Sequence, residues 1–151
     1  SRYNYSPGPQ HWKAAKRILR YLSNKTQYGL LYKSTDKKVI KIEAYSDSDF
    51  GGCVDTRKST TGFIIKLNND VISWSTKRQP IITLSSAEAE YVALTMMIQT
   101  LKWITNLLNE LQIQYHKPII VYWDNQQAIS LARNNTNHNR TKHIDIKSLY
   151  T

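Results

Sequence analysis

The chain has 151 residues, of which 40% are hydrophobic and 11% aromatic, and this composition excludes an intrinsically disordered protein. Its 21 lysines and arginines against 11 aspartates and glutamates give a formal net charge of +10, which favours a nucleic-acid partner over a merely soluble basic surface. No apolar run approaches the ~20 residues of a membrane-spanning helix, so no membrane partner is expected. The lone cysteine, Cys53, excludes an internal disulfide and fits a reducing, intracellular compartment.

The N-terminal part of the chain predicts a basic amphipathic helix. Residues 10–23 follow the turn-prone stretch Ser-Pro-Gly-Pro and carry an apolar stripe at helical spacing, with lysines and arginines off the stripe. The stripe consists of Trp12, Ala15, Leu19 and Leu22. A basic flank is usually a solvated face, but it could also lie along a phosphate backbone. Residues 28–34 then predict a short strand.

Three consecutive segments predict an antiparallel meander. Residues 39–47 alternate apolar and polar side chains and predict a strand that ends in Asp47. Residues 61–67 and 71–77 are separated by Asn-Asn-Asp, a sequence that favours a hairpin turn.

The second half of the chain predicts helix, strand and helix. Ser85 and Glu88 match the capping box S-x-x-E, and helical periodicity follows to about Leu111. The predicted buried stripe consists of Tyr91, Leu94, Ile98, Leu101, Ile104 and Leu108. Residues 118–124 are nearly all apolar, which is typical of a parallel strand buried on both faces, and they end in Asp124. A helix over residues 125–133 and a last helix from about His143 complete the prediction.

Three acids in these elements could form a metal site. Asp47 and Asp124 end two predicted strands, and chemistry collects at strand ends in open α/β sheets. Glu90 lies one turn inside the helix and could reach the same place. Clustered carboxylates repel each other unless a cation lies between them, and oxygen ligands suit Mg²⁺ or Mn²⁺. Taken singly, each acid is better explained by a turn, a helix cap or the helix dipole, and it is their joint placement that favours the metal site.

The sequence LSSAEAEY contains two of the four glutamates of the chain, two residues apart. Glu88 stands at the third helical position and suits the capping box. Glu90 lies beyond the first turn, where a capping role is over. We therefore assign Glu88 to structure and Glu90 to the metal site.

Seven motifs, in order, resemble the end of the polymerase region of copia-type LTR retrotransposons. They are PGPQHWKAAKRILRYL, YSDSDFGG, RKSTTGFI, ISWSTKRQ, LSSAEAEYVAL, VYWDNQQAI and RTKHIDI. The resemblance implies a reverse-transcriptase connection segment over residues 1–34 and a ribonuclease H domain over residues 35–151. It implies an α/β fold of the ribonuclease H type, with a mixed sheet of three antiparallel strands, a helix, a parallel strand and a helix.

The same resemblance implies cleavage of the RNA strand of RNA–DNA hybrids with two Mg²⁺ or Mn²⁺ ions. The family's first three acids match Asp47 in SDSD, Glu90 in AEAE and Asp124 in WDN, whereas Asp49 and Glu88 do not match. The implied partners are the hybrid and the rest of the polyprotein, in a cytoplasmic virus-like particle or the nucleus.

The chain departs from the family pattern at its end. The family continues past the HID motif into a last strand and a last helix that carries a fourth acid, and we expect both elements to be missing here. The alternative function is therefore a catalytically incomplete module that binds nucleic acid or protein. An open sheet edge would also favour self-association.

Four basic residues flank the hairpin strands and are expected to contact the hybrid backbone: Arg57, Lys58, Lys77 and Arg78. Trp74 and Trp123 are expected in the core rather than as base-stacking platforms. His138 and His143 are expected at the surface.

Overall fold

The structure is a computed structural model that describes residues 3–34, 38–124 and 144–148. The chain separates into two compact units, Ser1–Leu31 and Tyr32–Thr151.

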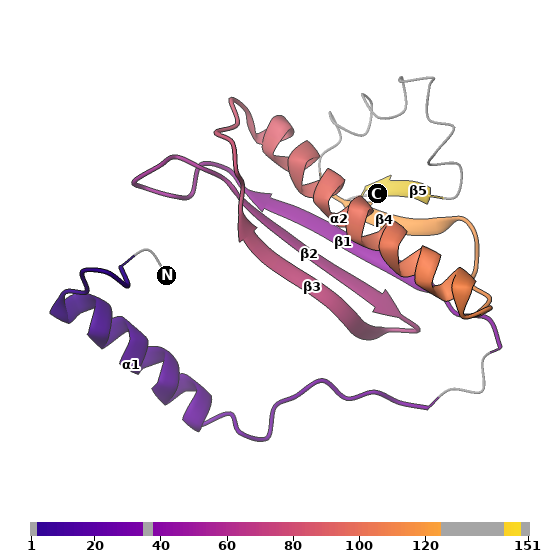
Figure 1. Ribbon diagram of the computed structural model, residues 1–151, viewed down its shortest axis with the longest axis horizontal. Helices are drawn as coiled ribbons and strands as arrows, with labels where there is room; N and C mark the ends of the chain where they lie inside the picture. The colour runs from indigo at the N-terminus through magenta and orange to yellow at the C-terminus, as the bar shows by residue number, and fades with distance from the viewer. Residues whose placement is uncertain (1–2, 35–37, 125–143, 149–151) are drawn as a thin grey trace. The chain divides into compact units, whose positions relative to one another are not determined.

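The first unit contains the predicted basic helix, α1 (Pro9–Ser23), drawn in indigo in Figure 1. Proline at its first position needs no amide partner, and the Gly8 amide donates a 2.8 Å hydrogen bond to His11 Nδ1. No residue of α1 is buried, so its apolar stripe remains exposed. The strand predicted over residues 28–34 is not formed, because this segment has no sheet partner.

The second unit is an α/β fold with one mixed sheet, as predicted for a ribonuclease H-like domain. β1 (Ile42–Asp49), β2 (Thr60–Leu67) and β3 (Asp70–Arg78) form the antiparallel meander. β4 (Ile119–Trp123) lies parallel to β1, and β5 (Ile144–Ser148) lies parallel to β4. The strand order is β3-β2-β1-β4-β5, as Figure 1 shows.

The hairpin between β2 and β3 forms at the predicted place. Asn68 and Asn69 have positive φ angles of 49° and 77°, the left-handed conformation that a two-residue hairpin turn needs. Asparagine adopts this conformation more readily than most residues, so the local sequence suffices to set the turn.

β5 corrects the expectation that the last strand is missing. Residues 144–148, for which a helix was predicted, pair with β4 in a register that runs from Ile119 opposite Ile144 to Trp123 opposite Ser148. An apolar strand such as β4 needs hydrogen-bonding partners on both sides, and the segment Ile-Asp-Ile supplies the second one. The helix predicted over residues 125–133 lies outside the described residues.

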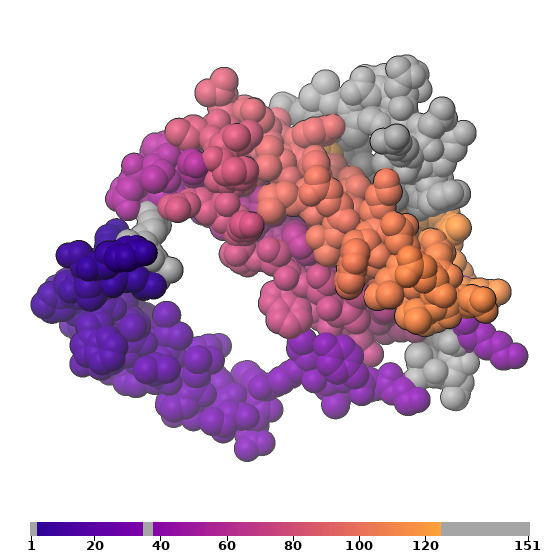
Figure 2. All heavy atoms as spheres, in the orientation of Figure 1, coloured from indigo at the N-terminus to yellow at the C-terminus, as the bar shows by residue number. Residues whose placement is uncertain are grey.

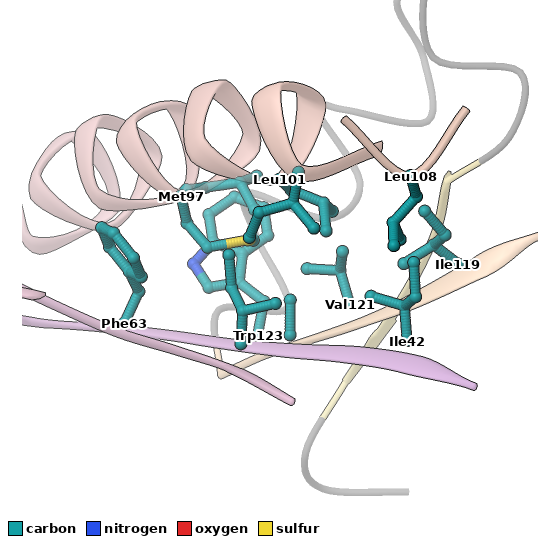
Figure 3. Close-up of a cluster of buried hydrophobic side chains, with 12 residues drawn as sticks. Ile42, Phe63, Met97, Leu101, Leu108, Ile119, Val121 and Trp123 are labelled. Carbon is teal, nitrogen blue, oxygen red and sulfur yellow. The ribbon is translucent and has the colours of Figure 1, made fainter. Parts of the chain in front are cut away.

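α2 (Ser86–Glu110) crosses one face of the sheet and closes the core. Figure 3 shows its Met97, Leu101 and Leu108 side chains directed at side chains of the sheet, among them Val121 and Trp123. In the space-filling view of Figure 2, the pink to orange atoms of α2 form a continuous band across the visible face.

The predicted stripe of α2 is largely confirmed, with one informative error. Leu94, Leu101, Ile104 and Leu108 are buried, but Tyr91 is 48% exposed. The buried face begins instead with Ala89 and Glu90. The Glu90 carboxylate thus lies on the buried face of α2, where helical periodicity predicts an apolar residue. Of the two tryptophans expected in the core, Trp123 is fully buried, whereas Trp74 on β3 is 61% exposed.

Candidate active site

Two neighbouring parallel strands bring Asp47 and Asp124 to the same edge of the sheet. The last register pair of β1 and β4 is Ser46 with Trp123, and each aspartate is the next residue along its strand. Both aspartates are exposed. β1 continues to Asp49, two residues beyond its predicted end.

The first turn of α2 separates the roles of the two neighbouring glutamates. The Glu88 amide donates to Ser85 Oγ at 3.1 Å, and the Leu84 amide donates to Glu88 Oε2 at 2.6 Å. Glu88 therefore caps the helix as predicted, although it reaches the amide of Leu84 rather than that of Ser85. Glu90 is only 9% exposed and faces the sheet.

The Glu90 carboxylate accepts three hydrogen bonds from two residues. The Ser48 amide and hydroxyl donate to Oε1 at 3.1 and 2.8 Å. The Trp123 indole Nε1 donates to Oε2 at 3.1 Å. The Ser48 amide also lies 2.8 Å from Asp47 Oδ1, so one backbone group lies between the two acids. Neither donor is predictable from the sequence, because nothing in the spacing of a serine or a tryptophan indicates a contact with a helix residue 42 or 33 positions away.

Among the residues that the structure describes, Glu90 lacks the cationic partner that the buried Glu43 has. Glu43 forms an ion pair with Lys41 at 2.9 Å and accepts a hydrogen bond from Tyr122. The hydrogen bond from Lys41 lowers the pKa of Glu43. Within the described part of the chain, Glu90 has only neutral donors. Burial raises the pKa of Glu90, the hydrogen bonds from Ser48 and Trp123 oppose that rise, and the charge of Asp47 adds to it.

The raised pKa of Glu90 predicts a pH dependence of stability in the absence of divalent ions. Between the pKa of a glutamate in the unfolded chain and the higher pKa of folded Glu90, the folded state keeps a proton that the unfolded state releases. The free energy of unfolding is therefore expected to fall as the pH rises through this window. In Glu90→Gln this component of the fall is expected to be absent. Urea unfolding of both proteins in EDTA at a series of pH values measures it, and identical pH profiles would contradict the prediction.

A buried polar network fixes the start of α2 against the sheet. Gln79, which is 1% exposed, donates from Nε2 to Thr61 Oγ1 at 3.1 Å and to the Ala89 carbonyl at 2.8 Å. Ser59 Oγ and Thr83 Oγ1 are 2.8 Å apart. Because Ala89 precedes Glu90, this network holds the helical turn that carries the buried acid. No sequence pattern indicates this network, since small polar residues next to strands usually belong to turns.

The three predicted acids do not form a complete set of metal ligands in the described part of the chain. Asp47 and Glu90 are joined through Ser48, while Asp124 follows Trp123. Among residues 3–34, 38–124 and 144–148, no three acidic, histidine or cysteine side chains form a group that could hold a metal ion.

The four predicted nucleic-acid-binding residues lie near the same sheet edge. The loop over residues 50–59 connects the end of β1 to the start of β2 and contains Arg57 and Lys58. Lys77 and Arg78 end β3, opposite Thr61 and Thr60 of β2.

Two of these basic side chains also have structural contacts. Lys58 Nζ donates to the Pro80 carbonyl, and Arg78 Nη1 lies 3.9 Å from the sulfur of Cys53. The edge with the acids is thus bordered by positive charge. His138 and His143 lie outside the described residues.

Comparisons with known proteins find long matches to transposon polyproteins. The chain is 40% identical over 147 residues to the retrovirus-related Pol polyprotein from transposon TNT 1-94 of Nicotiana tabacum, covering 97% of this chain and 11% of that protein. It is 41% identical over 144 residues to the corresponding protein from transposon RE2 of Arabidopsis thaliana, covering 95% of this chain and 10% of that protein. The chain therefore spans about a tenth of the length of these relatives.

A shorter relative is matched over most of its length. The secreted RxLR effector protein 161 of Plasmopara viticola is 43% identical over 105 residues, which are 70% of this chain and 72% of that protein. No family model matches the chain, and no solved structure matches it. In the described part of the chain, no helix is both long enough and apolar enough to cross a membrane.

Proposed function

Because this chain belongs to the Pol polyprotein family of copia-type retrotransposons, we propose that it is the ribonuclease H domain of such a polyprotein. Its reaction is metal-dependent cleavage of the RNA strand of an RNA–DNA hybrid. Its relatives are parts of a larger polyprotein, and the remainder of that polyprotein is its proposed partner.

The observation that carries the proposal is the buried Glu90 carboxylate, which faces the sheet beside Asp47 and has no cation among the described side chains. A buried acid without a counter-charge is costly, and a divalent ion would remove that cost. Carboxylate oxygens on a partly solvated edge are ligands that suit Mg²⁺ or Mn²⁺.

Asp47, Glu90 and Asp124 would hold the ions. When bound, two such ions supply an activated water and stabilise the leaving oxygen of a phosphodiester. Asp47 and Asp124 are exposed to solvent, from which the substrate would approach. The Glu90 carboxylate is held by hydrogen bonds from Ser48 and Trp123. Arg57, Lys58, Lys77 and Arg78 would bind the phosphate backbone of the hybrid, which favours binding by shape and charge rather than by base sequence.

A second candidate is a module that binds the hybrid without cutting it. The basic residues Arg57, Lys58, Lys77 and Arg78 near the acids support this alternative, because phosphate contacts bind nucleic acid without any metal chemistry.

Cleavage of a labelled RNA–DNA hybrid by the purified chain, with Mg²⁺ or Mn²⁺ and with EDTA, distinguishes the two candidates. We expect cleavage by the wild-type chain and by Glu88→Gln, because glutamine can also serve the capping box. We expect none by Glu90→Gln or in EDTA. If the wild-type chain binds the hybrid but does not cleave it, the nuclease function is rejected in favour of the binding module.

A further inference from the structure

The three hydrogen bonds to Glu90 come from the chain neighbours of the other two acids. Ser48 directly follows Asp47 on β1, and Asp124 directly follows Trp123, the last residue of β4. Both oxygens of the Glu90 carboxylate are engaged, Oε1 by Ser48 and Oε2 by Trp123. The side chain from the helix is therefore tied to the two strands that carry the aspartates.

The Trp123 indole is fixed independently of this contact. Trp123 is fully buried in the core between β4 and α2 (Figure 3). An indole has one hydrogen-bond donor and no acceptor, and a buried donor left without a partner costs about 1–3 kcal/mol. The position of the ring thus decides where the Glu90 Oε2 atom is held.

From this geometry we infer that Ser48 and Trp123 are positioning residues for the metal ligand Glu90. They fix the orientation of its carboxylate relative to Asp47 and Asp124 before any ion binds. This inference rests on the proposed function. Carboxylate ligands are commonly oriented by such hydrogen bonds, and loss of one outer partner typically lowers metal affinity or activity by about 10- to 100-fold.

A purely structural role for the same bonds makes a different prediction. If Ser48 and Trp123 only satisfied buried polar groups, removing a donor would lower stability without changing the metal dependence of cleavage. The metal concentration at half-maximal cleavage therefore separates positioning from packing.

The test compares Ser48→Ala and Trp123→Phe with matched controls. Ser46→Ala removes from the same strand a buried hydroxyl that has no hydrogen-bond partner among the described residues, and Trp103→Phe changes an exposed indole on α2. We expect the metal concentration at half-maximal cleavage to rise about 10-fold or more in Ser48→Ala and Trp123→Phe, with the KM for hybrid unchanged. The controls are expected to match the wild type, and Ser48→Thr, which keeps a hydroxyl, is expected to restore much of the metal affinity. If Ser48→Ala and Trp123→Phe both cleave with the metal dependence of the wild type, the positioning role is overturned, but the proposed nuclease function is not.

A readout that does not need cleavage is the indole N–H resonance of Trp123. Trp123→Phe identifies this resonance among the four tryptophans of the chain. We expect it to move on Glu90→Gln and again on addition of Mg²⁺ to the wild type, with Trp103 unaffected. If the wild-type chain does not cut the hybrid, the proposed nuclease function is overturned. The response of the Trp123 resonance to Mg²⁺ then decides whether Trp123 positions Glu90 for metal binding. A Trp123 resonance that shifts neither on Glu90→Gln nor on addition of Mg²⁺ would overturn the positioning role.

Discussion

Asp47→Asn is expected to lower the rate of hybrid cleavage by more than about 100-fold at saturating hybrid, because it removes a proposed direct metal ligand, and loss of even an outer partner of a ligand costs about 10- to 100-fold. Asparagine keeps the size of the side chain and its Oδ1 acceptor for the Ser48 amide. Asp47 is exposed, so the substitution is expected to leave the fold intact. Single-turnover cleavage rates at saturating metal and hybrid measure the effect.

Asp49→Asn is the matched control, two residues further along the same strand. Asp49 lies against the turn, where a Cβ on Gly52 would come within 1.8 Å of its Oδ2 atom. This contact with a glycine backbone points to a role in the turn, and asparagine has the same shape. We expect Asp49→Asn to cleave at close to the wild-type rate. A greater loss in Asp49→Asn than in Asp47→Asn would reverse the assignment of the two acids.

Leu101→Ala is expected to lower the free energy of unfolding by about 2–5 kcal/mol, the usual range for removal of a buried leucine. Leu101 is 0% exposed and lies at the middle of the interface between α2 and the sheet (Figure 3). For a domain of ordinary stability this is a large fraction of the total.

Leu107→Ala on the same helix is the control for that substitution. Leu107 is 39% exposed and is not part of the core cluster, so the expected loss is about 1 kcal/mol or less. Urea unfolding curves, fitted with a common m-value, measure the free energy of unfolding of both variants. Equal losses in the two variants would show that the face of α2 has been assigned wrongly.

Much of the fold follows from local patterns in the sequence. Asn68 and Asn69 indicate the hairpin turn, and the Ser85–Glu88 pair indicates the start of α2. The apolar run over β4 indicates a parallel strand, which the structure confirms by its parallel pairing with β1. Each of these signals depends on residues a few positions apart, whose preferences are expressed wherever the segment lies.

The errors fall where the outcome depends on distant segments. Residues 28–34 have strand-like composition but find no sheet partner, and residues 144–148 find one in β4 although their sequence suggested a helix. Strand formation is completed by hydrogen bonds to another segment, so composition alone does not decide it. Trp74 is exposed on β3, an edge strand of the sheet.

At the candidate site the sequence by itself determined which acids are present, which of two glutamates caps the helix and which strands the aspartates follow. Only the tertiary structure decided that Glu90 takes a buried position on α2 in place of Tyr91, and that Ser48 and Trp123 are its donors. Helical periodicity ranks positions by hydrophobicity, whereas a buried carboxylate is tolerated only when donors from other strands meet it. Those donors lie 42 and 33 residues away along the chain, and only the register of β1 with β4 brings them together.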